Sequence, residues 1–227
     1  MSCFTHFHET WFDKLRLLLN QLSSAPRPPS SPEQHQHLVD LVHKVMSHYT
    51  EYYRVKALAA QRDALSVIAA PWDTCLERSL HWIAGWRPTT AFHIIYTESS
   101  IQFESHIADI LRGLSTGDLR DLSPAQFRLI SELQSETIRE ENAITEDISA
   151  WQDGASGQLL DDYCADIEEK IGRLVNVLEK AENLRLRTVQ RVVDLLTTQQ
   201  AVEFLIAMAE LQFGIRAWGQ NQERAPA

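Results

Sequence analysis

Four of the nine histidines lie as two closely spaced pairs in the N-terminal third of the chain. The pairs are His6 with His8 and His35 with His37. Imidazole nitrogens bind zinc and haem iron, but residues two positions apart point to different sides of a helix. Each pair could therefore chelate a metal only in an extended segment. We interpret these histidines as solvated loop residues.

Acidic side chains near residues 153–157 are a second possible metal site. Glu140 and Glu141 precede this segment, and Asp161 and Asp162 follow it. Carboxylates in such numbers could gather a hard cation such as calcium. The alternating ligands and central glycine of an EF-hand loop are missing, so a solvated, charged helix face is favoured over a divalent-cation site.

A cysteine and a histidine that lie close in sequence could form a nucleophile and its base. Cys75 and His81 are six residues apart, with Glu77 and Arg78 between them. Two residues at this spacing lie only partly on the same face of a helix. No glycine-rich loop that could bind an oxyanion lies next to them in the sequence. We therefore expect no catalytic residues and no enzymatic activity, and we expect Glu77 and Arg78 to form an ion pair.

Tryptophan and arginine are enriched among the residues that dominate protein interfaces. Partner binding is the hypothesis for a small set of these residues. Packing at helix crossings is the alternative, and we favour it for Trp82 and Trp86. The candidates are Trp72, Trp82, Trp86, Arg87 and Trp151.

Apolar residues recur at helical spacing along most of the chain, without strand-like alternation or a fixed-period repeat. Ser123, Pro124 and Gln126 form the most secure helix start, and Thr197 with Gln200 repeats the capping pattern. We predict an all-α, single-domain bundle of six or seven helices, some long and kinked. The expected helices cover residues 9–22, 33–70, 73–85, 88–113, 124–151, 158–196 and 198–218.

The expected domain covers residues 9–219, between flexible ends at 1–8 and 220–227. A chain of 227 residues with 44% hydrophobic content has material for one core. Gly219 is expected to cap the last helix. The expected loops are the Pro/Ser segment 23–32 and residues 114–122 and 153–157.

The charge and cysteine content narrow the class of protein. A formal charge of −10 disfavours direct binding of nucleic acid. Three widely spaced cysteines without a C-x-x-C pair are typical of reduced, intracellular thiols. No basic, apolar leader and no run long enough to span a bilayer is found, so we expect a cytoplasmic protein.

Four blocks of the sequence resemble the DOG domain, a plant domain named for Delay of Germination and shared with the C-terminal half of TGA transcription factors. The most specific elements are W-I-x-G-W-[RK]-P at residues 82–88 and D-L-S-P-x-Q at 121–126. TGA factors carry a basic leucine zipper ahead of this domain. None precedes Phe4, so we expect a stand-alone DOG protein. The four blocks are residues 48–63, 70–96, 117–152 and 196–219.

The resemblance implies a non-enzymatic scaffold that acts through protein partners. Among stand-alone members, the opening WFDKLRLLL and the run SLHWIAGWRPTTAFHIIYTESS are most similar to the member that marks pollen aperture sites. This similarity implies peripheral plasma-membrane association, with a membrane-domain kinase or other aperture factors as partners. A seed-dormancy regulator that binds protein phosphatases is the alternative, a nuclear location is possible, and a homodimer is possible.

Ligand sensing is a further alternative that the resemblance raises. DOG domains of the TGA type have an apolar groove that could accept a fatty acyl chain. Some dormancy members bind haem through histidines near the C-terminus, but the last histidine here is His106. We therefore expect no resident cofactor, with a fatty acyl ligand or a divalent cation as alternatives.

Overall fold

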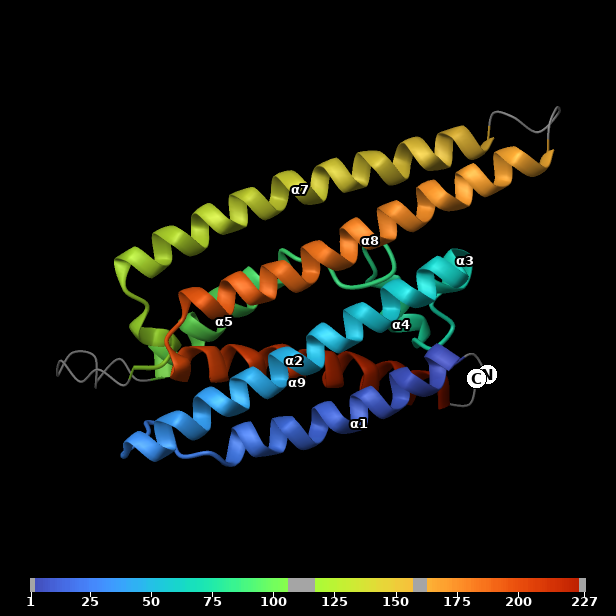
Figure 1. The fold of residues 1–227 in the computed structure, drawn as a ribbon. Coiled ribbons are helices and arrows are strands. Elements are labelled where there is room, and N and C mark those ends of the chain that lie inside the picture. Colours follow the sequence, from blue (N-terminus) through green and yellow to red (C-terminus); the bar gives the residue numbers. More distant parts are fainter. Residues whose placement is uncertain (1–2, 106–116, 157–162, 225–227) are drawn as a thin grey trace.

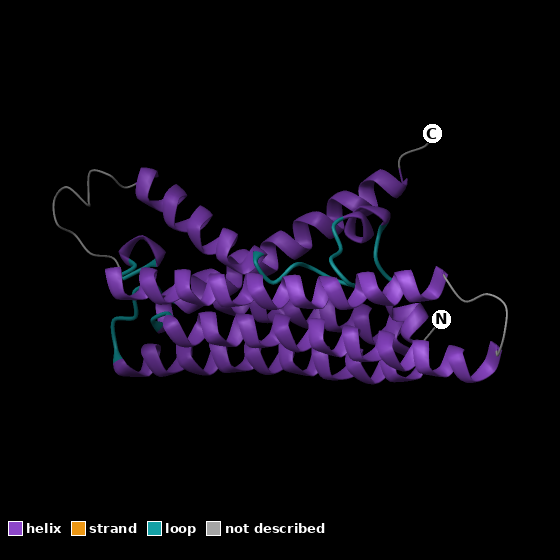
Figure 2. Cartoon of the chain, turned by 90° about the horizontal axis from the view of Figure 1, so that it is seen from above, coloured by secondary structure: helices purple, strands orange, loops and turns teal. Residues whose placement is uncertain are grey.

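Four long helices lie side by side in the order α7, α8, α2, α1 (Figure 1). They are α1 (Cys3–Ser24), α2 (Pro32–Arg62), α7 (Pro124–Ser156) and α8 (Tyr163–Leu195). Helices α5 (Thr90–Ser105) and α9 (Thr198–Arg224) pack across one face of this layer (Figure 2). This computed structural model describes residues 3–105, 117–156 and 163–224. The predicted all-α, single-domain bundle is confirmed.

Short elements connect the long helices. They are α3 (Ala64–Ala69), α4 (Cys75–Ser79) and the 3-10 turn η1 (Leu119–Asp121). Within the described ranges there is no strand, and no helix combines the length and apolarity that a bilayer crossing needs.

Local capping sets most of the helix starts. The Ser123 amide donates to Gln126 Oε1 at 3.0 Å while the Gln126 amide donates to Ser123 Oγ at 3.2 Å. Thr197 and Gln200 form the same reciprocal pair. Both predicted starts are confirmed, because each cap satisfies amides that have no partner within the helix.

Both ends of the chain are helical beyond the predicted domain limits. Helix α1 begins at Cys3, so the flexible segment expected at residues 1–8 is wrong for residues 3–8. Phe4 is buried, with its ring centroid 4.5 Å from that of Trp72. Helix α9 continues to Arg224 through the buried Gly219, which is therefore not its cap. Packing against residues distant in sequence extends both helices.

Two other predicted boundaries are also corrected. The long second helix ends at Arg62 rather than at residue 70, because Asp63 caps both α2 and α3 and accepts from the Ser66 amide at 2.9 Å. The loop expected at residues 153–157 is helical through Ser156, since α7 continues to that residue. The described part of the chain leaves out residues 106–116, 157–162 and 225–227. Residues 114–116 of the predicted loop 114–122 are therefore not described.

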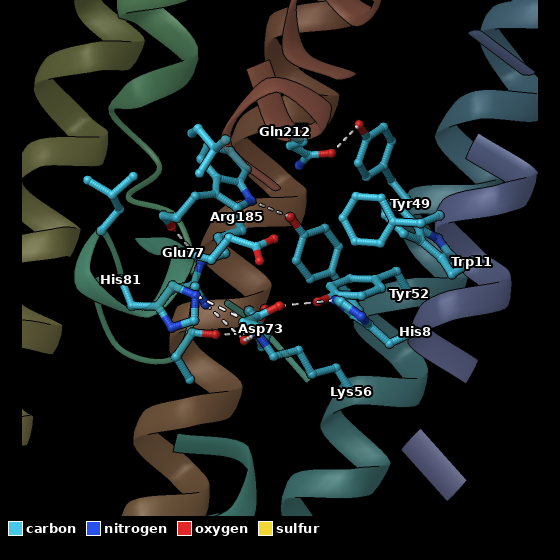
Figure 3. A pocket seen from close by; sticks show the side chains of 18 residues that line it. His8, Trp11, Tyr49, Tyr52, Lys56, Asp73, Glu77, His81, Arg185 and Gln212 are labelled. Carbon is cyan, nitrogen blue, oxygen red and sulfur yellow. Dashed lines mark hydrogen bonds and ion pairs between the residues drawn. The ribbon is translucent and has the colours of Figure 1, made fainter. Parts of the chain in front are cut away.

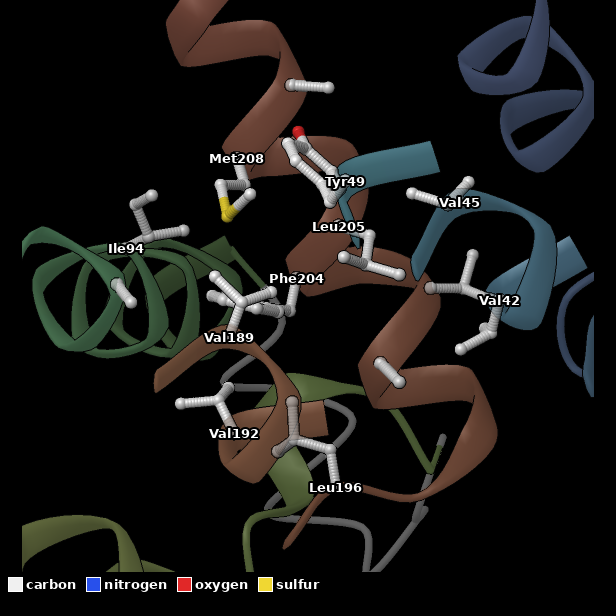
Figure 4. Close-up of a cluster of buried hydrophobic side chains, with 14 of the residues drawn as sticks. Val42, Val45, Tyr49, Ile94, Val189, Val192, Leu196, Phe204, Leu205 and Met208 are labelled. Atoms are coloured by element: carbon white, nitrogen blue, oxygen red, sulfur yellow. The ribbon is translucent and has the colours of Figure 1, made fainter. Parts of the chain in front are cut away.

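The part of the main core drawn in Figure 4 lies where α2, α5, α8 and α9 meet, and α1 adds Trp11, Leu15, Leu18 and Leu22 to the same core. Apolar side chains at helical spacing face inward from all four helices, and burial of each contributes about 1.5–3 kcal/mol relative to exposure. Among them are Val42, Val45, Tyr49, Ile94, Val189, Val192, Leu196, Phe204, Leu205 and Met208.

Candidate functional site

A tight turn at residues 82–86, here called the corner turn, lies in the connection between α4 and α5. The Trp82 amide donates to the Gly85 carbonyl at 2.7 Å, and Ile83 and Ala84 have φ values of 48° and 60°. A β-branched residue at positive φ is strained, so the surrounding structure must hold this conformation. A Cβ on Gly85 would lie 3.0 Å from Arg185 Cζ, which explains the glycine.

Three buried charged side chains, here called the ion triad, lie beneath the corner turn. Glu182 Oε1 is 2.8 Å from Lys56 Nζ and 2.8 Å from Arg185 Nη1. None of the three side chains is more than 4% exposed. Burial lowers the pKa of Lys56, and the adjacent Glu182 carboxylate offsets part of this effect. Charges buried this deeply need partners on every side.

The remaining donors of the ion triad bind carbonyls of the corner turn. Lys56 Nζ donates to the Ala84 carbonyl at 2.6 Å. Arg185 donates from Nε to the Trp86 carbonyl at 2.7 Å and from Nη2 to the carbonyls of Trp82 and Ile83. The triad therefore couples α2 and α8 to the strained backbone.

Asp73 organises a second polar group beside the triad. Its Oδ1 lies 3.4 Å from His8 Nε2 and 3.8 Å from Arg216 Nη1, and its Oδ2 lies 3.3 Å from His81 Nε2. Burial lowers the pKa of His8 to about 4, although Asp73 acts in the opposite direction. Burial alone would raise the pKa of Asp73, but the hydrogen bond from His81 holds it below its usual value.

A cavity of about 130 Å³ lies between these polar groups and the N-terminal helices. Trp11, Tyr49 and Tyr52 reach it from α1 and α2, whereas Glu77, His81 and Arg185 lie on its opposite side (Figure 3). The cavity therefore has an aromatic wall and a charged wall. This arrangement can bind a small molecule, and it can also hold four segments of the chain together.

Comparisons with known proteins agree with the sequence resemblance. The family described as Seed dormancy control, DOG1, matches residues 16–97. Protein DOG1-like 4 of Arabidopsis thaliana is 27% identical, with 96% of this chain and 93% of that protein covered. Transcription factor TGA2.3 of rice (Oryza sativa subsp. japonica) is 28% identical over 91% of this chain and 60% of that protein.

The chain is therefore similar to DOG1-like proteins and to TGA transcription factors. Protein DOG1-like 1 of Arabidopsis thaliana is also similar, at 26% identity over 82% of this chain and 78% of that protein. The family match includes Lys56, Asp73 and the corner turn but ends before Glu182 and Arg185. The ion triad therefore connects the matched segment to α8.

Two of the tryptophans proposed for partner binding, Trp82 and Trp86, donate from their ring nitrogens to other side chains. Trp82 Nε1 donates to Thr145 Oγ1 at 2.9 Å, and Trp86 Nε1 donates to Tyr53 Oη at 2.9 Å. Trp72 is 8% exposed. These positions agree with the packing alternative.

The other two proposed contact residues, Trp151 and Arg87, both take part in contacts of α7. Trp151 Nε1 donates to the Lys170 carbonyl at 2.8 Å, which joins α7 to α8. Arg87 is half exposed, and its Nε lies 2.8 Å from Glu141 Oε2. Of the five candidates, Arg87 offers a charged group at the surface.

Two of the four acidic residues considered as metal ligands, Glu140 and Glu141, pair with other groups of the protein. Glu140 pairs with Arg187, and the buried Glu141 accepts from Arg87 and from the Thr89 amide at 2.7 Å. Asp161 and Asp162 lie outside the described residues. Within the described ranges, no three His, Cys, Asp or Glu side chains are placed to hold a metal ion.

Two interpretations from sequence are wrong at this site. Glu77 pairs with Arg216 at 3.3 Å rather than with Arg78, whose Nη1 donates to the Asp73 carbonyl. His8 is buried against Asp73 and is not a solvated loop histidine, because it belongs to α1. His6, His35 and His37 are exposed as expected, but they too lie in helices rather than in loops.

Sequence reasoning did not find the ion triad. Lys56 continues the apolar stripe of α2, and Glu182 and Arg185 continue that of α8 at positions four and seven after Leu178. A charged residue in an apolar stripe is the signal that could have revealed each one.

Proposed function

We propose that this protein is a non-enzymatic DOG-domain scaffold that presents the α7–α8 hairpin to partner proteins. The observation that supports this proposal most is the length of the hairpin, which extends past the other helices (Figure 1). Each helix has 33 residues, equivalent to about 50 Å. One edge of α8 packs on α2, and α7 lies at the outer edge of the layer.

The hairpin carries exposed apolar side chains at helical spacing. Phe127 and Ile138 are three turns apart on α7 and are 54% and 40% exposed, and Ile167 and Ile171 are one turn apart on α8. Helix faces with such residues bind partner proteins in many complexes. These residues are the proposed contact surface.

A row of ion pairs supports the hairpin as a rigid unit. Glu136 pairs with Arg191 at 2.6 Å, Glu140 with Arg187, and Asp147 with Lys180 at 2.8 Å. The pairs keep one antiparallel register along the helices. Together they favour a preformed surface, which reduces the entropy that partner binding costs.

The sequence resemblance supports a role in specifying pollen aperture sites. The N-terminal segment and residues 79–100 resemble the Inaperturate Pollen protein. We propose peripheral association with plasma-membrane domains, mediated by a membrane-domain kinase or other aperture factors. A dormancy-type regulator that binds protein phosphatases is the second candidate, supported by the similarity to the DOG1-like proteins.

Affinity purification of the tagged protein from developing anthers and from seeds, followed by mass spectrometry, tests the two candidates. Enrichment of membrane-domain kinases or aperture factors from anthers supports the scaffold at aperture sites. Enrichment of phosphatases from seeds instead rejects that role in favour of the second candidate. If neither class is enriched, both roles are wrong.

A further inference from the structure

The size of the cavity beside the ion triad corresponds to one aromatic ring. Its volume is about 130 Å³. An engineered apolar cavity of roughly 150 Å³ in another protein holds one benzene molecule. A haem or a long acyl chain is far larger, whereas a six-membered ring with one small substituent fits.

The aromatic wall gives such a ring several faces for packing. The Trp11 and Tyr52 ring centroids are 4.6 Å apart, and the rings of Tyr49 and Tyr53 lie next to these two. Offset and edge-to-face contacts between aromatic rings contribute about 0.5–1.5 kcal/mol beyond the burial of their area. The ligand is therefore expected to be aromatic.

The charges around the cavity balance without a ligand. Each carboxylate has a cationic neighbour, so an added ion would lack a counter-charge in a buried site, which is costly. A neutral ligand avoids this cost. The three carboxylates and three cations are Asp73, Glu77, Glu182, Lys56, Arg185 and Arg216.

His8 supplies a buried acceptor. Its Nε2 faces the Asp73 carboxylate, so the proton of the neutral ring belongs on that nitrogen. Its Nδ1 is then an acceptor, and this atom has no hydrogen-bond partner among the described residues. His8 is 2% exposed and lines the cavity. A buried polar atom without a partner is uncommon, and a ligand hydroxyl would satisfy it.

We propose that this cavity binds a small, uncharged, planar aromatic molecule with a hydroxyl group, of the phenol class. The ring packs among the aromatic side chains, and the hydroxyl donates to Nδ1 of His8. Leu80 lines the cavity and is 54% exposed, so the cavity meets solvent there. This site is separate from the α7–α8 surface and does not depend on a protein partner.

Three probes of similar size and different charge test the proposal: phenol, benzoate and benzylammonium. Isothermal titration and thermal unfolding are measured with each probe at roughly 1–10 mM. Phenol is expected to raise Tm and to bind at least about tenfold more tightly than either ion. Equal or tighter binding of an ion, or no binding of phenol, overturns the proposal.

Two variants locate the binding. His8→Phe removes the acceptor and keeps a ring, and Leu80→Trp is designed to fill the opening. Both are expected to lose phenol binding, while Trp218→Ala, at an exposed position outside the cavity, is expected to keep it. If His8→Phe does not fold, the result for Leu80→Trp decides the test. Leu80 is at the surface, so this substitution is expected to leave the fold intact. Phenol binding that persists in Leu80→Trp at wild-type affinity contradicts the assignment.

Discussion

The ammonium group of Lys56 lies 2.8 Å from the carboxylate of Glu182, and both side chains are 4% exposed. The two residues come from helices distant in sequence, and Arg185 joins the pair from one turn along α8. Their remaining donors bind carbonyls of the corner turn. The buried charges and the strained turn therefore stabilise one another.

Removing one charge of the ion triad is expected to destabilise the protein strongly. Lys56→Met leaves Glu182 buried beside a single cation and frees the Ala84 carbonyl, so we expect a loss of about 3–5 kcal/mol. Urea unfolding monitored by circular dichroism measures this loss of unfolding free energy. Lys180→Met, which breaks an exposed pair, should cost less than about 1 kcal/mol. Equal effects of the two substitutions would show that the triad has no special role.

His8 is expected to make stability fall in mild acid. Its pKa is about 4 in the folded protein and 6.5 in the unfolded chain. Because the unfolded state binds the proton first, the contribution is complete above pH 6.5 and is lost as pH falls toward 4. The full effect is roughly 3 kcal/mol.

Comparison of the wild type with His8→Gln isolates this contribution from that of the carboxylates. The difference in unfolding free energy between the two proteins should narrow from pH 7 to pH 4, whereas that for His37→Gln, at an exposed position, should stay constant. A pH-independent difference for His8→Gln would contradict the burial of a neutral His8.

Two glycines in α9 should respond in opposite ways to alanine. A Cβ at Gly219 would overlap Thr74 Oγ1 and lie 2.8 Å from Thr74 Cβ, so Gly219→Ala must displace the cap of α4. At Gly214 nothing lies within 4 Å. We expect Gly219→Ala to lower Tm and Gly214→Ala to add up to about 1 kcal/mol. Differential scanning calorimetry of both variants checks the contact.

Adjacent glutamates on α7 give a matched comparison of a buried and an exposed pair. Glu141→Ala leaves the buried Thr89 amide without its acceptor and should cost about 1–3 kcal/mol. Glu140→Ala removes a surface pair with Arg187 and should cost less than about 1 kcal/mol. Chemical denaturation measures both, and a larger loss for Glu140→Ala would argue against the placement of Glu141.

Local signals in the sequence predicted the helices that they control. The reciprocal caps at Ser123 and Thr197 need only four consecutive residues, so both starts were visible without the structure. The helical ends of the chain were not visible in the sequence. Phe4 packs on Trp72 and Gly219 packs on Thr74, and both partners are far away in sequence. Such contacts between distant residues override local composition.

The candidate site was only partly predictable for the same reason. Trp82 and Trp86 of the corner turn and the adjacent Arg87 stand out by residue type, and they do lie beside the site. Lys56 and Glu182 each interrupt an apolar stripe, but only the packing of α2 on α8 shows that they pair. Their pairing across 126 positions has no trace in a single sequence.

The most direct test of the scaffold proposal compares partner capture by matched surface variants. The double variant Ile138→Asp with Ile171→Asp places charge on the exposed α7–α8 surface, and Leu17→Asp does so on α1, at the opposite edge of the layer. With folding verified by circular dichroism, quantitative purification from anthers should show loss of the enriched partners for the double variant alone. Equal recovery with all three proteins would contradict the account.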